Sequence, residues 1–258
     1  MQKPYIIKII SQKGGVGKTA IAVNLSVALK EIGYNTLLID SDLINPSVAF
    51  YLGLEDANVG LSSVIAGSSK LSNAIIKHIP TGLYVLPNII SNRLTMPVDH
   101  AIEKFNLELM KSGYDFIVID TPPGISTNEI IKNVDESIII STPEMPACVS
   151  CFRLIKEYKK RNIRYVPILN KVKNRNFELN QKEIEEALNE DIALVIPEDH
   201  IVQIGLSERI PAYLINPNSK FSKAIYALAV YFVHKAGKTE MLTKRQGILS
   251  LLIKKLIG

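Results

Sequence analysis

The chain has 258 residues, of which 47% are apolar and 21% are charged, and this balance excludes a wholly disordered protein. The longest uninterrupted apolar run, Ala224–Val233, has ten residues, whereas a transmembrane helix needs about 20, and no signal-peptide pattern precedes the first strand-like segment. The net charge of +5 equals the charge of residues 235–258 alone, where six basic residues stand against one acidic residue.

Short β-branched apolar runs alternate with longer amphipathic stretches along the chain. The runs predicted to be strands are Tyr5–Ile10, Thr36–Ile39, Leu83–Leu86, Phe116–Ile119, Ser137–Ile140, Tyr165–Leu169 and Ile192–Ile196. The stretches predicted to be helices are Lys18–Ile32, Val98–Lys111, Ala147–Arg161, Gln181–Leu188 and Ser219–His234. The strands are largely continuous apolar runs rather than alternating ones, which indicates a sheet covered on both faces. We therefore expect an α/β fold with a doubly wound, mainly parallel sheet flanked by helices.

A glycine-rich loop follows the first predicted strand and opens the first predicted helix. It reads Gln12-Lys13-Gly14-Gly15-Val16-Gly17-Lys18-Thr19 and continues into Ala20. In this setting the backbone N–H groups and the helix N-terminus bind phosphate, and Gly14, Gly15 and Gly17 permit unusual backbone angles. Lys18 can reach the β- and γ-phosphates of a nucleotide, and the Thr19 hydroxyl can ligate Mg²⁺. Residues 14–20 are therefore the predicted phosphate site.

Carboxylates follow two of the predicted strands. Asp40-Ser-Asp42 follows the second strand, and Asp120-Thr-Pro-Pro-Gly124 follows Phe116–Ile119. Because the carboxyl ends of parallel strands face the crevice in which α/β proteins bind ligands, these groups should lie beside the phosphate site. Asp120 has the position of a Walker B aspartate, which holds Mg²⁺ directly or through water. Gly124 can offer its backbone N–H to the γ-phosphate.

The glycine-rich loop departs from the ordinary P-loop, because Gln12 stands where the first glycine would be and a second lysine, Lys13, opens the loop. This pattern resembles the deviant Walker A motif of the MinD/ParA class of dimerising ATPases. The resemblance implies ATP and Mg²⁺ as cofactors, ATP hydrolysis and an ATP-dependent homodimer. It also implies that Lys13 reaches the phosphates of the other subunit, that Asp42 positions the attacking water, and that Asp40 supports the metal shell.

The same resemblance places the adenine pocket at two further strand ends. Asn170 follows the strand Tyr165–Leu169, and Pro197-Glu198-Asp199 follows the last strand. In MinD-like proteins an asparagine at the first place and the loop at the second contact the base. From the residues alone, both segments could equally be ordinary turns.

The C-terminal segment favours the MinD-like branch of this class. On a helical wheel, the apolar residues of Gly247–Ile257 fall on one half, except Leu251, and the basic residues fall on the other. We therefore expect residues 1–236 to form a P-loop ATPase domain. Residues 237–258 are expected to form a linker and an amphipathic helix that attaches to an anionic membrane through residues 244–258. The expected location is the cytoplasm, with peripheral membrane association and control of the position of an unidentified protein partner.

Two alternatives stay open. A ParA-like partition ATPase would bind DNA without sequence preference through the basic cluster Arg153–Arg175, although Asp42 is not followed by the usual Pro-Gln. An Mrp-type iron–sulfur carrier would use Cys148-Val-Ser-Cys151, although Mrp proteins carry their cysteine pair much further along the chain. Two thiolates per chain would hold a cluster only if two chains shared it. Two cysteines also form no disulfide framework, which is consistent with a reducing compartment.

Overall fold

The computed structural model describes residues 3–89, 97–124, 130–173, 175 and 178–242. The predicted amphipathic helix of residues 244–258 lies outside the described residues. Within the described part of the chain, no helix is both long enough and apolar enough to span a bilayer.

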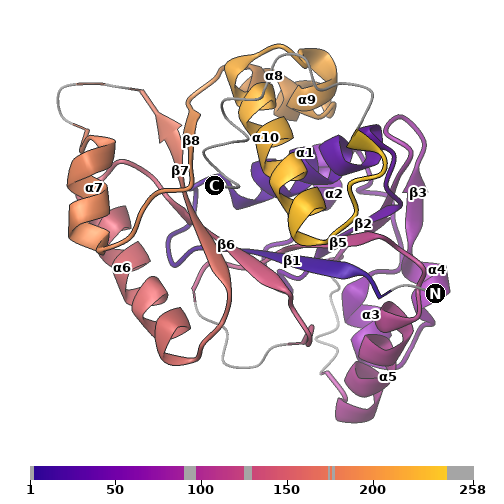
Figure 1. Ribbon diagram of the computed structural model, residues 1–258. Coiled ribbons are helices and arrows are strands. Elements are labelled where there is room, and N and C mark those ends of the chain that lie inside the picture. The colour runs from indigo at the N-terminus through magenta and orange to yellow at the C-terminus, as the bar shows by residue number, and fades with distance from the viewer. Residues whose placement is uncertain (1–2, 90–96, 125–129, 174, 176–177, 243–258) are drawn as a thin grey trace.

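One eight-stranded sheet organises the described residues, in the strand order β3-β4-β2-β5-β1-β6-β7-β8 (Figure 1). The strands are β1 (Tyr5–Ile10), β2 (Thr36–Asp40), β3 (Ile76–His78), β4 (Leu83–Leu86), β5 (Phe116–Asp120), β6 (Glu136–Ser141), β7 (Tyr165–Val172) and β8 (Leu194–Pro197). All neighbours pair in parallel except β3, which runs antiparallel to β4 at one edge. The predicted doubly wound, mainly parallel α/β fold is confirmed.

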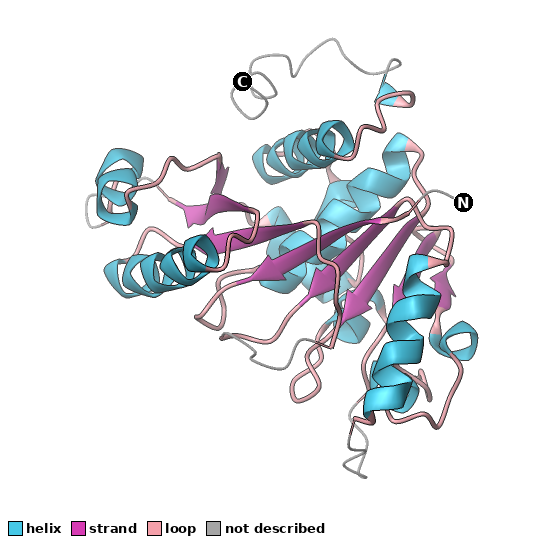
Figure 2. Cartoon of the chain, turned by 60° about the horizontal axis from the view of Figure 1, so that its bottom comes forward, coloured by secondary structure: helices cyan, strands magenta, loops and turns pink. Residues whose placement is uncertain are grey.

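Helices cover both faces of this sheet (Figure 2). They are α1 (Lys18–Ile32), α2 (Val48–Leu52), α3 (Leu61–Ile65), α4 (Leu71–Ala74), α5 (Asp99–Met110), α6 (Met145–Lys160), α7 (Gln181–Leu188), α8 (Ile201–Glu208), α9 (Ala212–Ile215) and α10 (Lys220–Lys235). Residues of α1, α2, α8, α9 and α10 share one apolar cluster with one face of the sheet. The opposite face packs on α3, α4 and α5 over one half and on α6 and α7 over the other.

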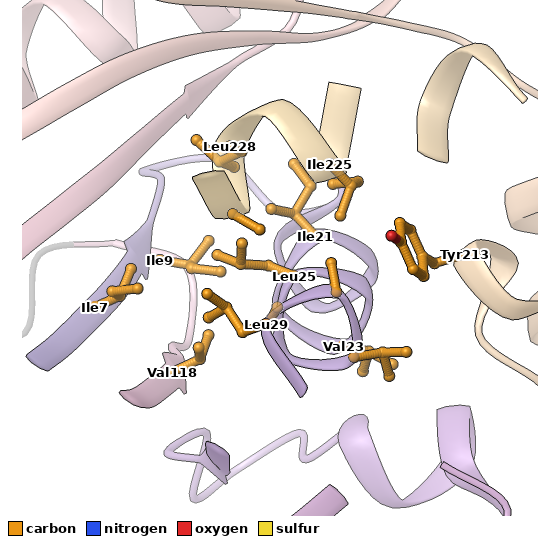
Figure 3. Packing of buried hydrophobic residues seen from close by; sticks show 14 of the residues in the cluster. Ile7, Ile9, Ile21, Val23, Leu25, Leu29, Val118, Tyr213, Ile225 and Leu228 are labelled. Atoms are coloured by element: carbon orange, nitrogen blue, oxygen red, sulfur yellow. The ribbon is translucent and has the colours of Figure 1, made fainter. Parts of the chain in front are cut away.

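The main core forms where α1 and α10 lie on the central strands. Ile7 and Ile9 of β1 point toward Leu25 and Leu29 of α1 (Figure 3), and α10 lies beside α1 on the same face of the sheet, where it also contacts β8. Their neighbours in β1, Ile6 and Ile10, point to the opposite face, as the two-residue period of a strand requires. Because apolar residues fill both faces, β1 is held rigidly, and so is the loop that follows it.

All seven predicted strands and all five predicted helices are present, most of them with ends within two residues of the prediction. Six short elements were not predicted: α2, α3, α4, β3, α8 and α9. All of these except α8 have only three to five residues, which is too few to show a helical period or an alternation in the sequence. The last strand spans Leu194–Pro197 rather than Ile192–Ile196, and α6 begins at Met145 rather than Ala147, with a proline in its first turn.

The first residues beyond α10 pack on the domain. Lys238 Nζ lies 3.0 Å from Asp115 Oδ1, and the hydroxyl of Tyr34 donates a hydrogen bond to the carbonyl of Lys238. Met241 lies against Gly33 at the C-terminal end of α1, and Leu242 is buried in the main core. Residues 237–242 of the predicted linker are therefore attached to the domain, and the division at residue 236 remains a prediction.

Candidate functional site

The loop between β1 and α1 has the conformation that two of its glycines permit. Gly15 and Gly17 have φ angles of +74° and +98°, in the left-handed region that other residues rarely adopt. A Cβ atom on Gly17 would also collide with the side-chain amide of Asn170. Gly14 does not have a positive φ, so the expectation of an unusual backbone angle is wrong for this glycine.

Lys18 opens α1 and is buried. Its Nζ donates a hydrogen bond to Ser11 Oγ (3.2 Å), and Ser11 directly follows β1. Burial lowers the pKa of Lys18, while the nearby carboxylates Asp120 and Asp42 oppose that shift. The buried ammonium group of Lys18 therefore lies between the glycine-rich loop and the carboxylates of Asp42 and Asp120. A polyphosphate bound to this loop would contact it. The contact with Ser11 was not predicted.

Thr19 and Asp120 meet at the end of β5. The Thr19 hydroxyl donates to Asp120 Oδ2 (2.6 Å) and lies 2.8 Å from Ser47 Oγ. The other carboxylate oxygen, Asp120 Oδ1, is buried and has no hydrogen-bond partner among the residues that the structure describes. A buried carboxylate oxygen normally has a partner, and carboxylate and hydroxyl oxygens are ligands that Mg²⁺ prefers. The residues therefore fit a Mg²⁺ held by Thr19 and Asp120.

Asp40 was predicted to belong to the same metal shell, and its contacts are with the backbone. Its Oδ1 accepts the N–H of Asp42 (3.1 Å), and its Oδ2 accepts those of Ser47 and Val48 (2.9 and 3.0 Å). Burial raises the pKa of Asp40 to about 6, although these hydrogen bonds oppose the shift. In this structure Asp40 shapes the loop that brings Ser47 to Thr19, so its support of the metal is indirect.

Replacing Asp120 with asparagine tests the metal site through stability. Burial and the nearby Asp40 raise the pKa of Asp120 to about 7. A carboxyl group whose pKa is higher in the folded than in the unfolded chain loses stabilisation as pH rises. The melting temperature of the metal-free protein should therefore fall from pH 5 to pH 8. In Asp120→Asn this fall should be smaller, and Mg²⁺-dependent hydrolysis should drop at least about tenfold.

Differential scanning fluorimetry in EDTA, over a pH series, measures the first effect, and phosphate release measures the second. Asp115→Asn is the matched control, because Asp115 is partly exposed and lies at the other end of β5. Equal pH slopes in wild type and Asp120→Asn would contradict the assignment.

Asp42 lies at the start of the loop that follows β2. Its Oδ1 accepts the N–H groups of Ile44 (3.0 Å) and Asn45 (2.8 Å), and its carbonyl accepts a hydrogen bond from Asn88 Nδ2 (2.9 Å). The side chain is nearly buried, with 8% of the residue exposed. These contacts fix the carboxyl group of Asp42. Its negative charge acts to raise the pKa values of the nearby Lys18 and Asp120.

A cavity of about 380 Å³ extends from the loop toward β7 and β8. Its predicted lining residues are Gly15, Gly17, Lys18, Thr19, Ala20, Asn170, Pro197, Glu198 and Asp199. Lining residues that the sequence reasoning missed are Ser47, Tyr51, Lys171, Val202, Gln203, Leu206 and Phe221. The size and the mixed apolar and polar lining suit a nucleotide. Lys13, Gly14, Val16, Asp40, Asp42, Asp120 and Gly124 do not line this cavity.

The two predicted base-binding segments do line the cavity, but their side chains already have partners in the protein. Asn170 Nδ2 donates to the carbonyl of Val16 (2.7 Å), and Lys171 Nζ donates to that of Gly15 (2.7 Å). Asp199 accepts the N–H groups of Ile201 and Phe221, at the starts of α8 and α10. Asn170 thus holds the phosphate loop, and its contact with a base remains a prediction.

Lys13 and Gly124 contact other parts of the chain rather than the cavity. Lys13 Nζ pairs with Glu144 Oε2 (3.0 Å) on the surface, with 43% of the lysine side chain exposed. The N–H of Gly124 donates to the carbonyl of Ser11 (2.9 Å). A contact between Gly124 and a γ-phosphate would therefore require this hydrogen bond to break.

The cysteine pair is part of the core. Cys148 and Cys151 are buried in the apolar cluster under α6, and burial raises the pKa of both thiols, that of Cys151 to about 12. In the described residues no group of three or more His, Cys, Asp or Glu could hold a metal ion. The two cysteines are therefore packing residues in this structure. By contrast, Arg153, Lys156 and Lys160 of the basic cluster are exposed along α6.

Comparisons with known proteins agree with this geometry. Residues 3–205 match the family described as ParA: NUBPL iron-transfer P-loop NTPase. An uncharacterized ATP-binding protein of Methanocaldococcus jannaschii is 29% identical over 98% of this chain and 96% of its own. The septum site-determining protein MinD of Thermotoga maritima is 32% identical over 87% of this chain and 86% of its own. MinD of Pyrococcus horikoshii, solved with Mg-ADP, has a TM-score of 0.78 at 31% identity and covers 91% of this chain and 97% of its own.

Proposed function

Because the chain belongs to the ParA/MinD family of P-loop NTPases, we propose that it is a Mg²⁺-dependent ATPase of the MinD-like kind. In this proposal ATP drives two copies into a homodimer, and the dimer attaches to an anionic membrane surface. Attachment controls where the chain places a protein partner, and hydrolysis to ADP releases it.

The positions of the two loop lysines are the observation that carries this proposal. Lys18 is buried beside Ser11 and the carboxylates, so it can serve the phosphates of its own chain. Lys13 extends along the surface to Glu144, away from the cavity that Lys18 lines. An exposed cation at the edge of a phosphate site can reach the phosphates of a second copy, where it would stabilise transition-state charge as an arginine finger does.

The hydrolytic step uses groups of this chain that are already held in place. The loop N–H groups and Lys18 bind the phosphates, and a Mg²⁺ held by Thr19 and Asp120 would supply further positive charge there. Asp42 holds the water for attack in line with the bond that breaks, with its own orientation fixed by Ile44 and Asn45. Lys13 of the partner subunit then completes the charge around the transferring phosphoryl group.

One observation favours a second function, DNA partition. Arg153, Lys156 and Lys160 are exposed on α6 and could contact DNA phosphates. The iron–sulfur carrier alternative has less support, because Cys148 and Cys151 are buried and a cluster shared by two chains needs accessible thiolates. We therefore keep DNA binding as the competing function for the test below.

Sedimentation with anionic liposomes, and separately with plasmid DNA, in ADP and in ATP, tests the membrane proposal. ATP should increase the liposome-bound fraction several-fold, because two linked tails bind with a high effective concentration. Leu252→Glu should reduce binding at least about tenfold, since burial of one leucine contributes about 1.5–3 kcal/mol.

Leu251→Glu is the matched control for this experiment. Leu251 is the same residue type one position earlier, but the helical wheel places it on the polar half, so its replacement should have a much smaller effect. Basal ATP hydrolysis should be unchanged in both variants. If both bind liposomes as wild type does and the chain sediments with DNA in ATP, the membrane proposal is wrong and DNA partition replaces it.

A further inference from the structure

Asn88 connects the loop that carries Asp42 to a different layer of the molecule. It follows β4 after Pro87 and is 1% exposed. Its Nδ2 donates to the carbonyl of Asp42 (2.9 Å), and its Oδ1 accepts the N–H of Ser62 in the first turn of α3 (3.1 Å). The buried side-chain amide of Asn88 thus links the loop that carries Asp42 to α3 through one donated and one accepted hydrogen bond.

The side of this contact that faces α3 is rigid. The N–H of Leu61 donates to the carbonyl of Pro87 (2.8 Å), and a Cβ atom on Gly60 would collide with that same carbonyl. Leu61, Val64 and Ile65 of α3 are buried against the sheet. Asn88 is therefore anchored between the end of β4 and a packed helix that does not belong to the nucleotide cavity.

Other hydrogen bonds of the Asp42 loop come from the ends of β2 and β5, and Leu43 of the same loop packs on the apolar cluster that includes α3. The N–H of Asp42 donates to Asp40 Oδ1, the N–H and hydroxyl of Ser41 donate to the carbonyl of Asp120, and Asp42 Oδ1 binds the two N–H groups that follow it. In the described residues, the side-chain hydrogen bond that reaches this loop from the side of β4 and α3 is that of Asn88. Its loss would leave the buried carbonyl of Asp42 without this donor, while the apolar packing of Leu43 would remain.

We propose that Asn88 is a positioning residue for hydrolysis: through the carbonyl of Asp42 it holds the water-positioning carboxyl group at its working place. This inference rests on the proposed role of Asp42. Because Asn88 does not line the nucleotide cavity, it should influence kcat and not the binding of ATP. A small misplacement of a catalytic group can lower a rate by as much as about a hundredfold.

The test separates the two hydrogen bonds of Asn88. Asn88→Asp keeps an acceptor for the N–H of Ser62. It is assayed at about pH 9, because burial can raise a carboxyl pKa by several units, and in its ionised form the carboxylate cannot donate to the carbonyl of Asp42. Asn88→Ala removes both bonds. We expect kcat to fall about ten- to a hundredfold in both variants, with KM and the affinity for a fluorescent ATP analogue within about threefold of wild type. ATP-dependent dimers, followed by light scattering, should still form and should persist longer because hydrolysis is slow.

Asn106→Ala is the matched control. Asn106 is also buried and also joins two segments, since it donates to the carbonyls of Ile102 and Ile130 and accepts the N–H of Lys132. It lies on the same face of the sheet as α3, and its hydrogen bonds among the described residues do not involve the Asp42 loop. Its replacement should lower the melting temperature and leave kcat unchanged. A drop in kcat of the same size in Asn106→Ala would show that loss of packing, and not the contact with Asp42, slows hydrolysis.

Asp42→Ala, measured in parallel, separates failure of this inference from failure of the proposed function. If Asp42→Ala hydrolyses ATP at the wild-type rate, the proposed role of Asp42 is wrong and Asn88 has no group to position. If Asp42→Ala is inactive while Asn88→Asp has wild-type kcat, the positioning role is wrong and the proposed ATPase stands. A weaker ATP affinity with unchanged kcat in Asn88→Asp would likewise overturn the inference. If Asn88→Ala fails to fold, Asn88→Asp still decides between these outcomes.

Discussion

Replacing Lys18 with alanine is expected to lower the affinity for ATP at least about a hundredfold and to abolish turnover. Lys18 is buried, so folding has already desolvated its ammonium group before a nucleotide binds. A hydrogen bond to a charged group contributes about 1.5–3 kcal/mol, and Lys18 can bond to two phosphates at once. The variant also leaves Asp120 and Asp42 without their nearby cation, which raises the pKa of Asp120 further.

Fluorescent-nucleotide titration and phosphate release measure these two effects. Lys30→Ala is the matched control, because Lys30 lies in the same helix near its other end and pairs with Glu31 on the surface. Its affinity and turnover should equal those of wild type. An ATP affinity in Lys18→Ala within about threefold of wild type would mean that the glycine-rich loop is not the phosphate site.

Replacing Lys13 with alanine is expected to remove the ATP-dependent dimer while leaving the binding of nucleotide to the monomer intact. The chain should lose little stability, because an exposed ion pair such as that between Lys13 and Glu144 contributes only about 0–1 kcal/mol. A dimer that relies on this cation at each of its two sites would lose both contacts in a single substitution. Hydrolysis should fall with the dimer.

Light scattering in ATP and in ADP, in an Asp42→Ala background that keeps ATP intact, measures the assembly. Lys3→Ala provides the control, since Lys3 is about as exposed as Lys13 and pairs with Asp135, which does not line the cavity. We expect the Lys3 variant to dimerise with ATP and the Lys13 variant to stay monomeric. A stable ATP dimer in the Lys13 variant would show that this lysine acts only within its own chain.

The sequence was sufficient for the parts of the site that are local. The glycines, Lys18 and Thr19 form one continuous motif between a strand and a helix. Asp40 and Asp120 are the last residues of β2 and β5, and Asp42 lies two residues beyond β2. Their meeting at one edge of the sheet follows from parallel topology alone. This is why the structure brings Thr19 and Asp120 within 2.6 Å although they are 101 residues apart.

Residues brought in by tertiary packing could not be predicted in this way. Tyr51 and Leu206 reach the cavity from α2 and α8, two helices that were not predicted from the sequence. Asn88 and Ser11 belong to no motif, and their significance depends on which atoms lie beside them after folding. The contact of Asn170 with the phosphate loop shows the same limit, because the position was predicted while its present partner was not.

Helix α1 determines how far the nucleotide is from the place where the C-terminal segment begins. The phosphate loop lies at its first residue, and Met241 and Leu242 pack at its far end, near Gly33. Fifteen residues of α-helix separate the two places by about 22 Å. A γ-phosphate therefore cannot touch residues 241–242. In the proposed membrane attachment, each C-terminal segment should then bind a bilayer equally well in either nucleotide state, and ATP would act by joining two of these segments in a dimer. When monomers predominate, the amount of membrane-bound dimer would rise with the square of the protein concentration. A modest local increase in protein concentration would then produce a membrane zone with a sharp boundary.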